Sequence, residues 1–428
     1  MSDKTMEVPE AIPQLSSAPT SLEELPFEIH HLILSQAPTF DALRALVHAS
    51  PQLHSVYVQN RLPILRNFVR KTFDGFLVDA HAAYLSGTDE FQQSRSDLTL
   101  WAFVDTYRLA TVAWSDVLTH PPLEHLIQLI RFYHSVVEPL TEWYATWALT
   151  ALSSSPKTHP LSSTERQRIQ RALYRLQVFC NLCGSRGKGH SAPVYIENPV
   201  DRLRVLSLFP AWQIEEILCI HEFAKDICGG IFYQVAWDLD ELRNPRYRHI
   251  DMTSVNDNLL LFSSPECDIN RESLDCVLRQ GLTLLSTMLK TMDHEELVEV
   301  VRKGILAAQW SGSYYSWIDE AVGDGPQVTR RENWYSGEDA AQDRRHKMPF
   351  GGIDTPDLPP LAWVTFWRGE ASNVFGYYIP ETFRRWGYVM WDAVRLKASG
   401  AMEYMKLESR LDYWDPREDD YLTEDSNA

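Results

Sequence analysis

Apolar residues recur at three- and four-residue steps along most of this chain, which is the spacing of one face of an α-helix. Residues that cap helices stand where these stripes begin, as Ser162 does with Glu165 three positions later. Evidence for strands is thin, because only residues 194–196, 231–235 and 362–366 read as short extended pieces. The pattern therefore predicts an all-α, predominantly helical fold.

The stripes and their caps also predict where individual helices begin and end. Three short helices are expected in the first structured segment, from Leu22 onward, and a longer one over residues 63–85. Gly229 and Gly230 are expected to end the helix that Pro210 opens, because glycine disfavours a helix interior. The further predicted helices cover residues 98–118, 123–152 and 162–183, a stretch from Asn270 to Leu285, one that begins at Asp293, and one from Pro380 to Val394.

Composition divides the 428 residues into four parts. Residues 1–20 are polar, contain prolines and lack periodicity, so we expect a disordered lead. Residues 21–66 form the segment of short helices, and residues 67–416 a large irregular helical domain. Within that domain, residues 324–360 are dense in Gly, Pro, Asp and Arg and are expected to form a long loop. Residues 417–428 form an acidic tail.

The net charge and the cysteine content limit which binding partners and which cellular compartment we expect. The formal net charge is −18, and the densest basic patch is only Arg66, Arg70 and Lys71, so we expect no nucleic-acid or membrane partner. No apolar run has the length of a membrane span, and residues 1–20 do not read as a signal peptide. With only six cysteines in the chain, we expect free thiols and a cytoplasmic or nuclear location.

One group of residues has the chemistry of a zinc site. Cys180 and Cys183 share a helix face, and Cys219, His221 and Cys228 follow after a gap. The gap and the lack of a second Cys-x-x-Cys pair depart from the spacing of structural zinc sites. We therefore expect these cysteines to fill the core as small apolar residues, and we predict no metal ligand.

Other short motifs fail on their spacing. The glycine-rich stretch 184–189 does not match a phosphate-binding loop, because Leu182 and Gly189 stand where a glycine and a Ser or Thr are required. The acidic pair Asp238 and Asp240 lacks further ligands, and His294 lacks the second histidine of a zinc protease helix. We predict no catalytic and no cofactor-binding residue, although a Ser or Cys paired with a distant His leaves no mark in sequence.

Aromatic residues are abundant, with 14 Trp and 18 Tyr. They gather around residues 310–317 and 363–391. Aromatic side chains at this density either fill a large helical core or line a recognition surface, and we favour the core. An enzyme of unknown reaction, with a site in the aromatic-rich region from 200 to 400 and residues 310–317 as one candidate place, is the alternative from another functional class.

The first helices pose a problem of area. A bundle of about 40 residues cannot bury its own apolar faces well. The stripes that contain Leu25, Ile29 and Ile33, and then Leu43 and Val47, must therefore pack against something else. That neighbour is either the helix that follows, from Pro63 onward, or another protein.

The same residues resemble a known module. Ser21-Leu-Glu-Glu-Leu-Pro-Phe-Glu-Ile-His-His-Leu-Ile-Leu, followed by Leu43-Arg-Ala-Leu-Val-His-Ala-Ser-Pro, resembles an F-box, with Leu25-Pro26-x-Glu28-Ile29 as its best mark. Ala49-Ser50-Pro51 with Tyr57 is similar to a variant found in a large set of filamentous-fungal F-box-like proteins. Residues 210–217 and 384–392 resemble later segments of the same proteins.

The resemblance implies a three-helix hook that docks a Skp-type adaptor of cullin ubiquitin ligases, while the rest of the chain selects a substrate protein. It implies no catalytic role for this chain. A structural scaffold whose first helices pack internally is the alternative. The residues that match the adaptor-contact positions of the family are Leu25, Pro26, Ile29, Ile33, Leu43, Val47 and Ser50.

Overall fold

The computed structural model of the chain describes residues 21–112, 121–152, 160–184, 196, 198–239, 274, 277–308 and 317–408. Within these ranges every regular element is a helix, and an isolated bridge pairs Lys347 with Glu370. The predicted all-α fold is confirmed. None of the described helices has the length and apolar character needed to cross a membrane. The expected disordered lead and acidic tail lie outside the described residues.

The chain divides into two units, and the described part of the first consists of residues 21–72 with Pro122–Leu126. Its helices α1 to α4 contact one another, and Thr39 and Ser50 cap α2 and α3 by accepting hydrogen bonds from the amides of Ala42 and Gln52. The elements of residues 21–72 are η1 (Leu22–Glu24), α1 (Phe27–Ser35), α2 (Phe40–Ala49), α3 (Pro51–Gln59) and α4 (Arg61–Thr72).

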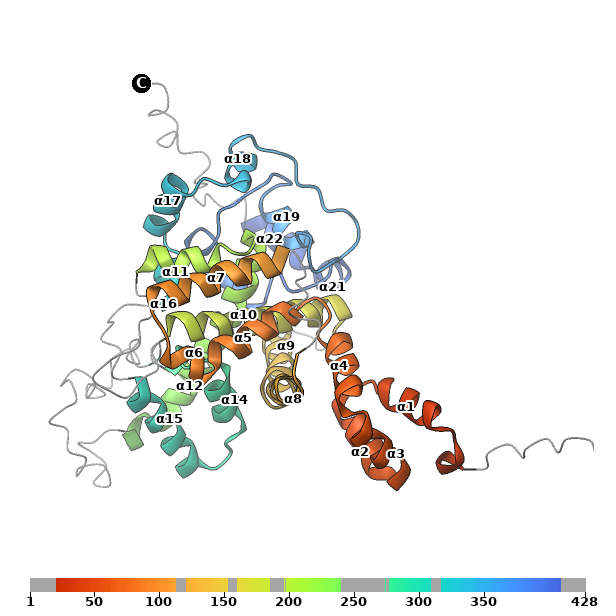
Figure 1. Ribbon diagram of the computed structural model, residues 1–428. Coiled ribbons are helices and arrows are strands. Elements are labelled where there is room, and N and C mark those ends of the chain that lie inside the picture. The colour runs from red at the N-terminus through yellow and green to blue at the C-terminus, as the bar shows by residue number, and fades with distance from the viewer. Residues whose placement is uncertain are drawn as a thin grey trace, which may run out of the picture. The chain divides into compact units, whose positions relative to one another are not determined.

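The second unit contains the rest of the described chain, from Phe73 onward. Figure 1 shows α5, α7, α10 and α11 lying side by side in it. Its elements begin with α5 (Leu77–Gly87), α6 (Asp89–Gln93), α7 (Asp97–Val112), α8 (Leu123–Phe132, of which the first residues belong to the first unit), the π-helical turn η3 (Tyr133–Val137), α9 (Glu138–Leu152), α10 (Ser163–Cys183), α11 (Pro199–Leu206) and α12 (Ala211–Leu239). They continue with α14 (Leu282–Lys290), α15 (His294–Ala308), α16 (Trp317–Ala321), α17 (Asp324–Asn333), α18 (Gly337–Asp343), α19 (Leu361–Phe366), η8 (Gly376–Tyr378), α20 (Glu381–Arg385), α21 (Ala393–Ser399) and α22 (Ala401–Glu408).

Helix α10 is the central element of the second unit, and it contacts both α5 and α12. Its start matches the prediction, because Ser162 and Glu165 form a reciprocal capping box. Almost every residue of α10 is buried, including Arg168, Arg171 and Arg175. These arginines stand three and four positions apart, so they form a charged row along one face of a buried helix.

Each arginine of this row has a partner from another part of the chain. Arg168 donates to Asp392 at 3.1 Å, and Arg171 donates to both carboxylate oxygens of Glu216 at 2.8 Å. Arg175 donates to Asp79 on α5 at 3.0 Å, and its guanidinium lies 3.9 Å from the centre of the Phe209 ring. A buried charge is tolerated only when it is paired in this way, so the row fixes where α5, α12 and the C-terminal segment lie against α10.

Three predicted helices are wrong because each is broken in the structure. The stretch expected to be helical from Asn270 to Leu285 is interrupted at Gly281, whose φ is +88°, and α14 begins only at Leu282. The helix expected over residues 63–85 is two helices, α4 and α5, separated at Gly75, whose φ of +78° is a left-handed conformation. The helix expected from Pro380 to Val394 stops at Arg385, and α21 begins only at Ala393. Trp386, Tyr388 and Trp391 lie buried between them, so tertiary packing overrides the helical spacing there.

Other boundaries also differ from prediction. Helix α12 continues through Gly229 and Gly230 to Leu239, since buried Phe232 and Val235 hold its final turns. The expected long loop at 324–360 contains α17 and α18, and its Asp and Arg residues serve as caps and ion pairs. Two of the suggested extended pieces, 231–235 and 362–366, are helical.

A second buried ion pair joins the C-terminal segment to α12. Arg384 donates to both carboxylate oxygens of Glu215, at 2.9 and 3.1 Å, and also to the carbonyl oxygen of Gly376. Glu215 accepts a third hydrogen bond from the amide of Gly376 at 2.7 Å. Burial alone would lower the pKa of Arg384, but the Glu215 carboxylate outweighs it and the pKa is raised. The charged pair is therefore favoured in the folded state.

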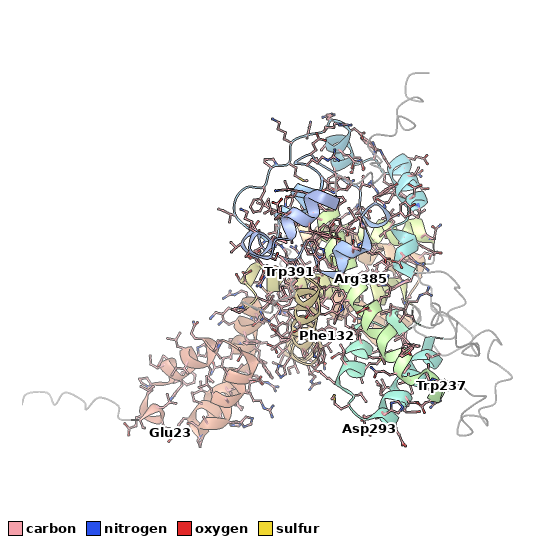
Figure 2. All side chains as sticks on the ribbon, turned by 180° about the vertical axis from the view of Figure 1, so that it is seen from behind. Glu23, Phe132, Trp237, Asp293, Arg385 and Trp391 are labelled. Atoms are coloured by element: carbon pink, nitrogen blue, oxygen red, sulfur yellow. The ribbon has the colours of Figure 1, made fainter. Side chains whose placement is uncertain are left out.

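Replacing Arg384 with methionine should lower the free energy of unfolding by about 3–5 kcal/mol, because Glu215 would remain buried without its counter-ion. Arg385→Met is the matched control, since the Arg385 side chain is exposed and should cost less than about 1 kcal/mol. Figure 2 labels Arg385 beside this segment. Adding Glu215→Gln to Arg384→Met should recover much of the loss, because glutamine can still accept from Gly376. Urea unfolding of the three variants measures these differences, and equal effects of Arg384→Met and Arg385→Met would contradict the assignment.

Candidate functional site

Apolar side chains of η1 and α1 remain exposed in the first unit. The exposed fraction is 43% for Leu22, 45% for Phe27, 40% for Ile29 and 52% for Leu32. Pro26 precedes α1 and is also exposed, while Leu25 is partly buried. Large exposed apolar side chains gathered on one short segment are typical of a protein-binding surface. We refer to Leu22, Leu25, Pro26, Phe27, Ile29 and Leu32 as the α1 surface.

Two hydrogen bonds anchor η1. The buried His30 donates from Nε2 to the carbonyl oxygen of Leu22 at 2.7 Å. Ser50, the cap of α3, donates from Oγ to the carboxylate of Glu23 at 2.9 Å, and Figure 2 labels Glu23 in this unit. Residues before α1 are therefore held to α1 and to the start of α3, which gives the α1 surface a defined shape.

The sequence-predicted adaptor residues fall into two groups in the structure. Pro26 and Ile29 are exposed, and Leu25 and Ile33 are partly buried. Leu43, Val47 and Ser50 are buried, and only 2% of Leu43 is exposed. A partner cannot reach Leu43 and Val47 while α2 stays packed in its unit.

The side of α1 opposite the α1 surface packs against other helices of its own unit. Asn67 of α4 donates to the carbonyl oxygen of Ser35 at 2.8 Å, and the rings of Phe40 and Phe68 meet edge to face with centroids 6.2 Å apart. Leu34 is buried on this side. Helices α3 and α4 thus both pack against α1, while Phe27, Ile29 and Leu32 stay exposed.

Sequence reasoning missed Leu22, Phe27 and Leu32 as candidate contact residues. The signal for them was present, because α1 carries apolar residues around most of its circumference. A helix of this kind can bury one side and still leave apolar side chains on the other. Leu25, Ile29 and Leu32 follow three- and four-residue steps just as His30 and Leu34 do, so the spacing alone does not tell which side is buried.

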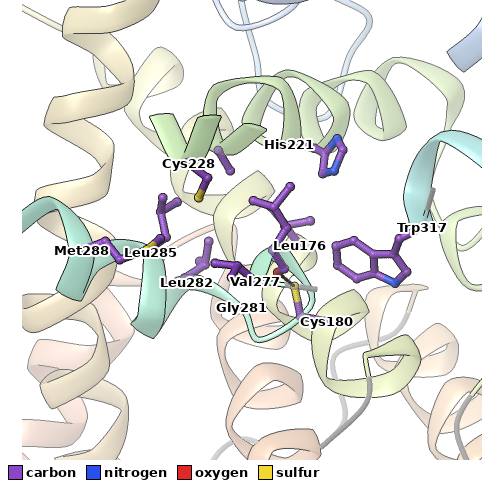
Figure 3. A pocket seen from close by; sticks show the side chains of 12 residues that line it. Leu176, Cys180, His221, Cys228, Val277, Gly281, Leu282, Leu285, Met288 and Trp317 are labelled. Atoms are coloured by element: carbon purple, nitrogen blue, oxygen red, sulfur yellow. Dashed lines mark hydrogen bonds between the residues drawn. The ribbon is translucent and has the colours of Figure 1, made fainter. Parts of the chain in front are cut away.

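The cysteines and histidine of the suggested zinc site lie in the interior. Cys180 of α10 and His221 and Cys228 of α12 line one small pocket together with residues of α14, as Figure 3 shows. Burial raises the pKa of the Cys228 thiol to about 12, as it does for Cys183, so these thiols stay protonated. The described residues contain no group of three or more His, Cys, Asp or Glu placed to hold a metal ion. The expected core role of the thiols is confirmed for Cys180, Cys183, Cys219 and Cys228, which are free and buried.

His221 lines this pocket together with the thiols of Cys180 and Cys228. Its Nε2 has no hydrogen-bond partner among the described residues, and its Nδ1 lies 4.0 Å from a carboxylate oxygen of Asp319. Burial lowers its pKa to about 4, against a smaller opposing effect of Asp319. The pocket volume is about 10 Å³, which is the space of a single water molecule. No substrate can enter a pocket of this size, so it gives no support to an enzyme site beside Trp317.

The aromatic clusters serve mainly as core in the described part of the chain. Trp317, Trp363 and Trp391 are fully buried, whereas Tyr377 is exposed. Trp310, Tyr314 and Tyr315 lie outside the described residues. Most of the aromatic side chains that the structure describes in these clusters therefore fill the core of the second unit.

The pH dependence of stability should reveal His221. Its folded pKa lies below the unfolded value of 6.5, so its contribution is fully present above pH 6.5 and is lost as the pH falls toward 4. The loss corresponds to about 3 kcal/mol for a shift of this size. His221→Leu should remove this part of the decline in urea unfolding between pH 7 and pH 4, whereas the exposed His54→Leu should keep it. A wild-type decline that His221→Leu leaves unchanged would show that His221 is not its source.

Comparison with known proteins adds no relative. No protein-family model, curated protein or solved structure matches the chain. A function must therefore be inferred from the residues and geometry of the chain itself.

Proposed function

We propose that this protein is an F-box-like receptor, in which the α1 surface docks a Skp-type adaptor of a cullin ubiquitin ligase and the second unit engages a substrate protein. The observation that carries the proposal is the exposure of Phe27, Ile29 and Leu32 on a helix whose opposite side is already packed. The chain itself would supply binding and no catalytic group.

The exposed area has the character of a binding surface. Four large apolar side chains, each about half exposed, lie within eleven residues of chain. Burying such side chains against a partner contributes about 25 cal/mol for each Å² removed from water. Aromatic and branched apolar residues that are fully buried by a partner carry most of the energy in protein interfaces. Phe27 and Ile29 are the residues best placed to do so.

The position of this surface agrees with the resemblance noted in the sequence. Leu25, Pro26 and Ile29 match the opening contact positions of F-boxes, and Pro26 and Ile29 are exposed. Leu43 and Val47 match the second patch but contribute to the core. The proposed interface is therefore narrower than the family pattern implies, and it includes Phe27 and Leu32 instead.

The net charge of −18 supports a protein partner over a polyanion. Phosphate backbones and anionic lipid surfaces would be repelled on average by an acidic chain. The α1 surface contributes no cation that would offset this repulsion, since its six residues are apolar. An apolar contact with another polypeptide fits both the charge and the surface.

Ile29→Asp combined with Leu32→Asp should weaken binding of a purified Skp-type adaptor at least about tenfold, which is 1.4 kcal/mol or more. Both side chains are exposed, so the melting temperature should stay within a few degrees of wild type. Isothermal titration calorimetry measures the affinity, and circular dichroism measures the melting temperature.

Val58→Asp is the matched control, because Val58 is an exposed apolar residue of α3 outside the α1 surface. This variant should bind the adaptor as tightly as the wild type does. A wild-type protein that binds no adaptor, or an Ile29→Asp and Leu32→Asp protein that binds it unchanged, would refute the proposed docking.

A further inference from the structure

A second candidate site lies in the second unit, apart from the α1 surface. It is a pocket of about 230 Å³ whose walls come from α7, α11, α12, α17 and the segment around Phe375. Val104, Phe209, Ile214 and Phe375 line it and are buried, so much of its wall is apolar. A pocket of this kind with a few polar groups is the usual form of a ligand site.

Arg204 is one of three arginines that line this pocket, together with Arg108 and Arg330. Its guanidinium carbon lies 4.2 Å from the centre of the Trp101 ring and 5.8 Å from the centre of the Trp334 ring. Among the residues that the structure describes, these ring contacts are the interactions of its side chain. Stacking on rings occupies the faces of a guanidinium and leaves its N–H donors free at the edge. Arg204 is therefore held in place and can still bind an anion.

Arg330 lines the same pocket, but its charge is already paired. It is buried, and its two terminal nitrogens donate to the two carboxylate oxygens of Asp339 at 3.0 and 2.6 Å. Its Nε–H has no acceptor within the described part of the chain. This nitrogen is enclosed by protein, so of these two arginines a ligand in the pocket can reach the donors of Arg204.

The acidic groups of the pocket limit the charge of a ligand. Asp105 is paired with Arg108 at 2.9 Å, and Glu338 also lines the pocket. Burial and the neighbouring Asp339 carboxylate raise the pKa of Glu338. A doubly charged anion would meet more repulsion from Glu338 than a singly charged one would. The planar edge of a guanidinium also matches the two oxygens of a carboxylate.

We propose that this pocket binds a carboxylate carried on an apolar or aromatic body, with Arg204 as the principal donor to the carboxylate. The carboxylate takes the free N–H edge of Arg204, and the body packs against Phe209, Ile214 and Phe375. A small free acid and the C-terminal residue of a polypeptide share this chemistry. The pocket and the α1 surface belong to different units, so the proposal does not depend on adaptor binding.

The test uses the full-length protein and three probes in isothermal titration calorimetry. The probes are an acetylated tripeptide that ends in phenylalanine with a free carboxylate, the same peptide as its C-terminal amide, and 3-phenylpropionate. We expect the peptide acid to bind at least about tenfold more tightly than the amide, because only the acid can pair with Arg204. Binding of 3-phenylpropionate as well identifies the ligand as any apolar carboxylate, and binding of the peptide acid alone identifies a polypeptide terminus.

Variants assign the interaction to Arg204. Arg204→Gln should weaken binding of the peptide acid at least about tenfold and leave binding of the amide unchanged. Arg131→Gln, at an exposed arginine of α8, is the matched control and should bind as the wild type does. Glu338→Gln should increase the affinity for the peptide acid and not for the amide, because it removes a negative charge from the pocket. This variant tests the pocket even if Arg204→Gln does not fold. The proposal is overturned if neither acid binds the wild type, if the amide binds as well as the acid, or if folded Arg204→Gln binds the acid unchanged.

Discussion

The fold of the second unit depends on the pairing of charged side chains that are buried in its interior. Helix α10 places Arg168, Arg171 and Arg175 in the interior, where an unpaired guanidinium would be too costly. Their carboxylate partners come from α5, from α12 and from the segment that ends at Asp392. The observed arrangement of these elements satisfies all three arginines at once.

The pairs of this interior are not equivalent. Burial raises the pKa of Glu216 and lowers the pKa of Arg171 despite the attraction between the two charges. For this pair, the cost of removing the charges from water therefore exceeds the attraction between them. For Arg384 the balance is reversed, because the Glu215 carboxylate outweighs burial and raises the pKa of Arg384.

Helix positions that depend on residues close in sequence were predicted correctly. The cap at Ser162 and the helical spacing were readable, because a helix start needs only residues close in sequence. The break at Gly75 and the continuation through Gly229 and Gly230 were not, since tertiary contacts decide whether a glycine interrupts a helix. The apolar character of α1 indicated a binding surface, but the pattern could not tell that Leu43 and Val47 face inward. The pocket around Arg204 left no motif, because Trp101, Arg204 and Trp334 are far apart along the chain.

The anchoring of η1 has a consequence for the speed and cost of association. His30 and Ser50 hold Leu22 and Glu23 in place before any partner arrives. A preorganised surface loses little conformational entropy on complex formation, so a modest contact area can yield useful affinity. Releasing either hydrogen bond would let the first residues sample many conformations, and each encounter would then have to select the competent one.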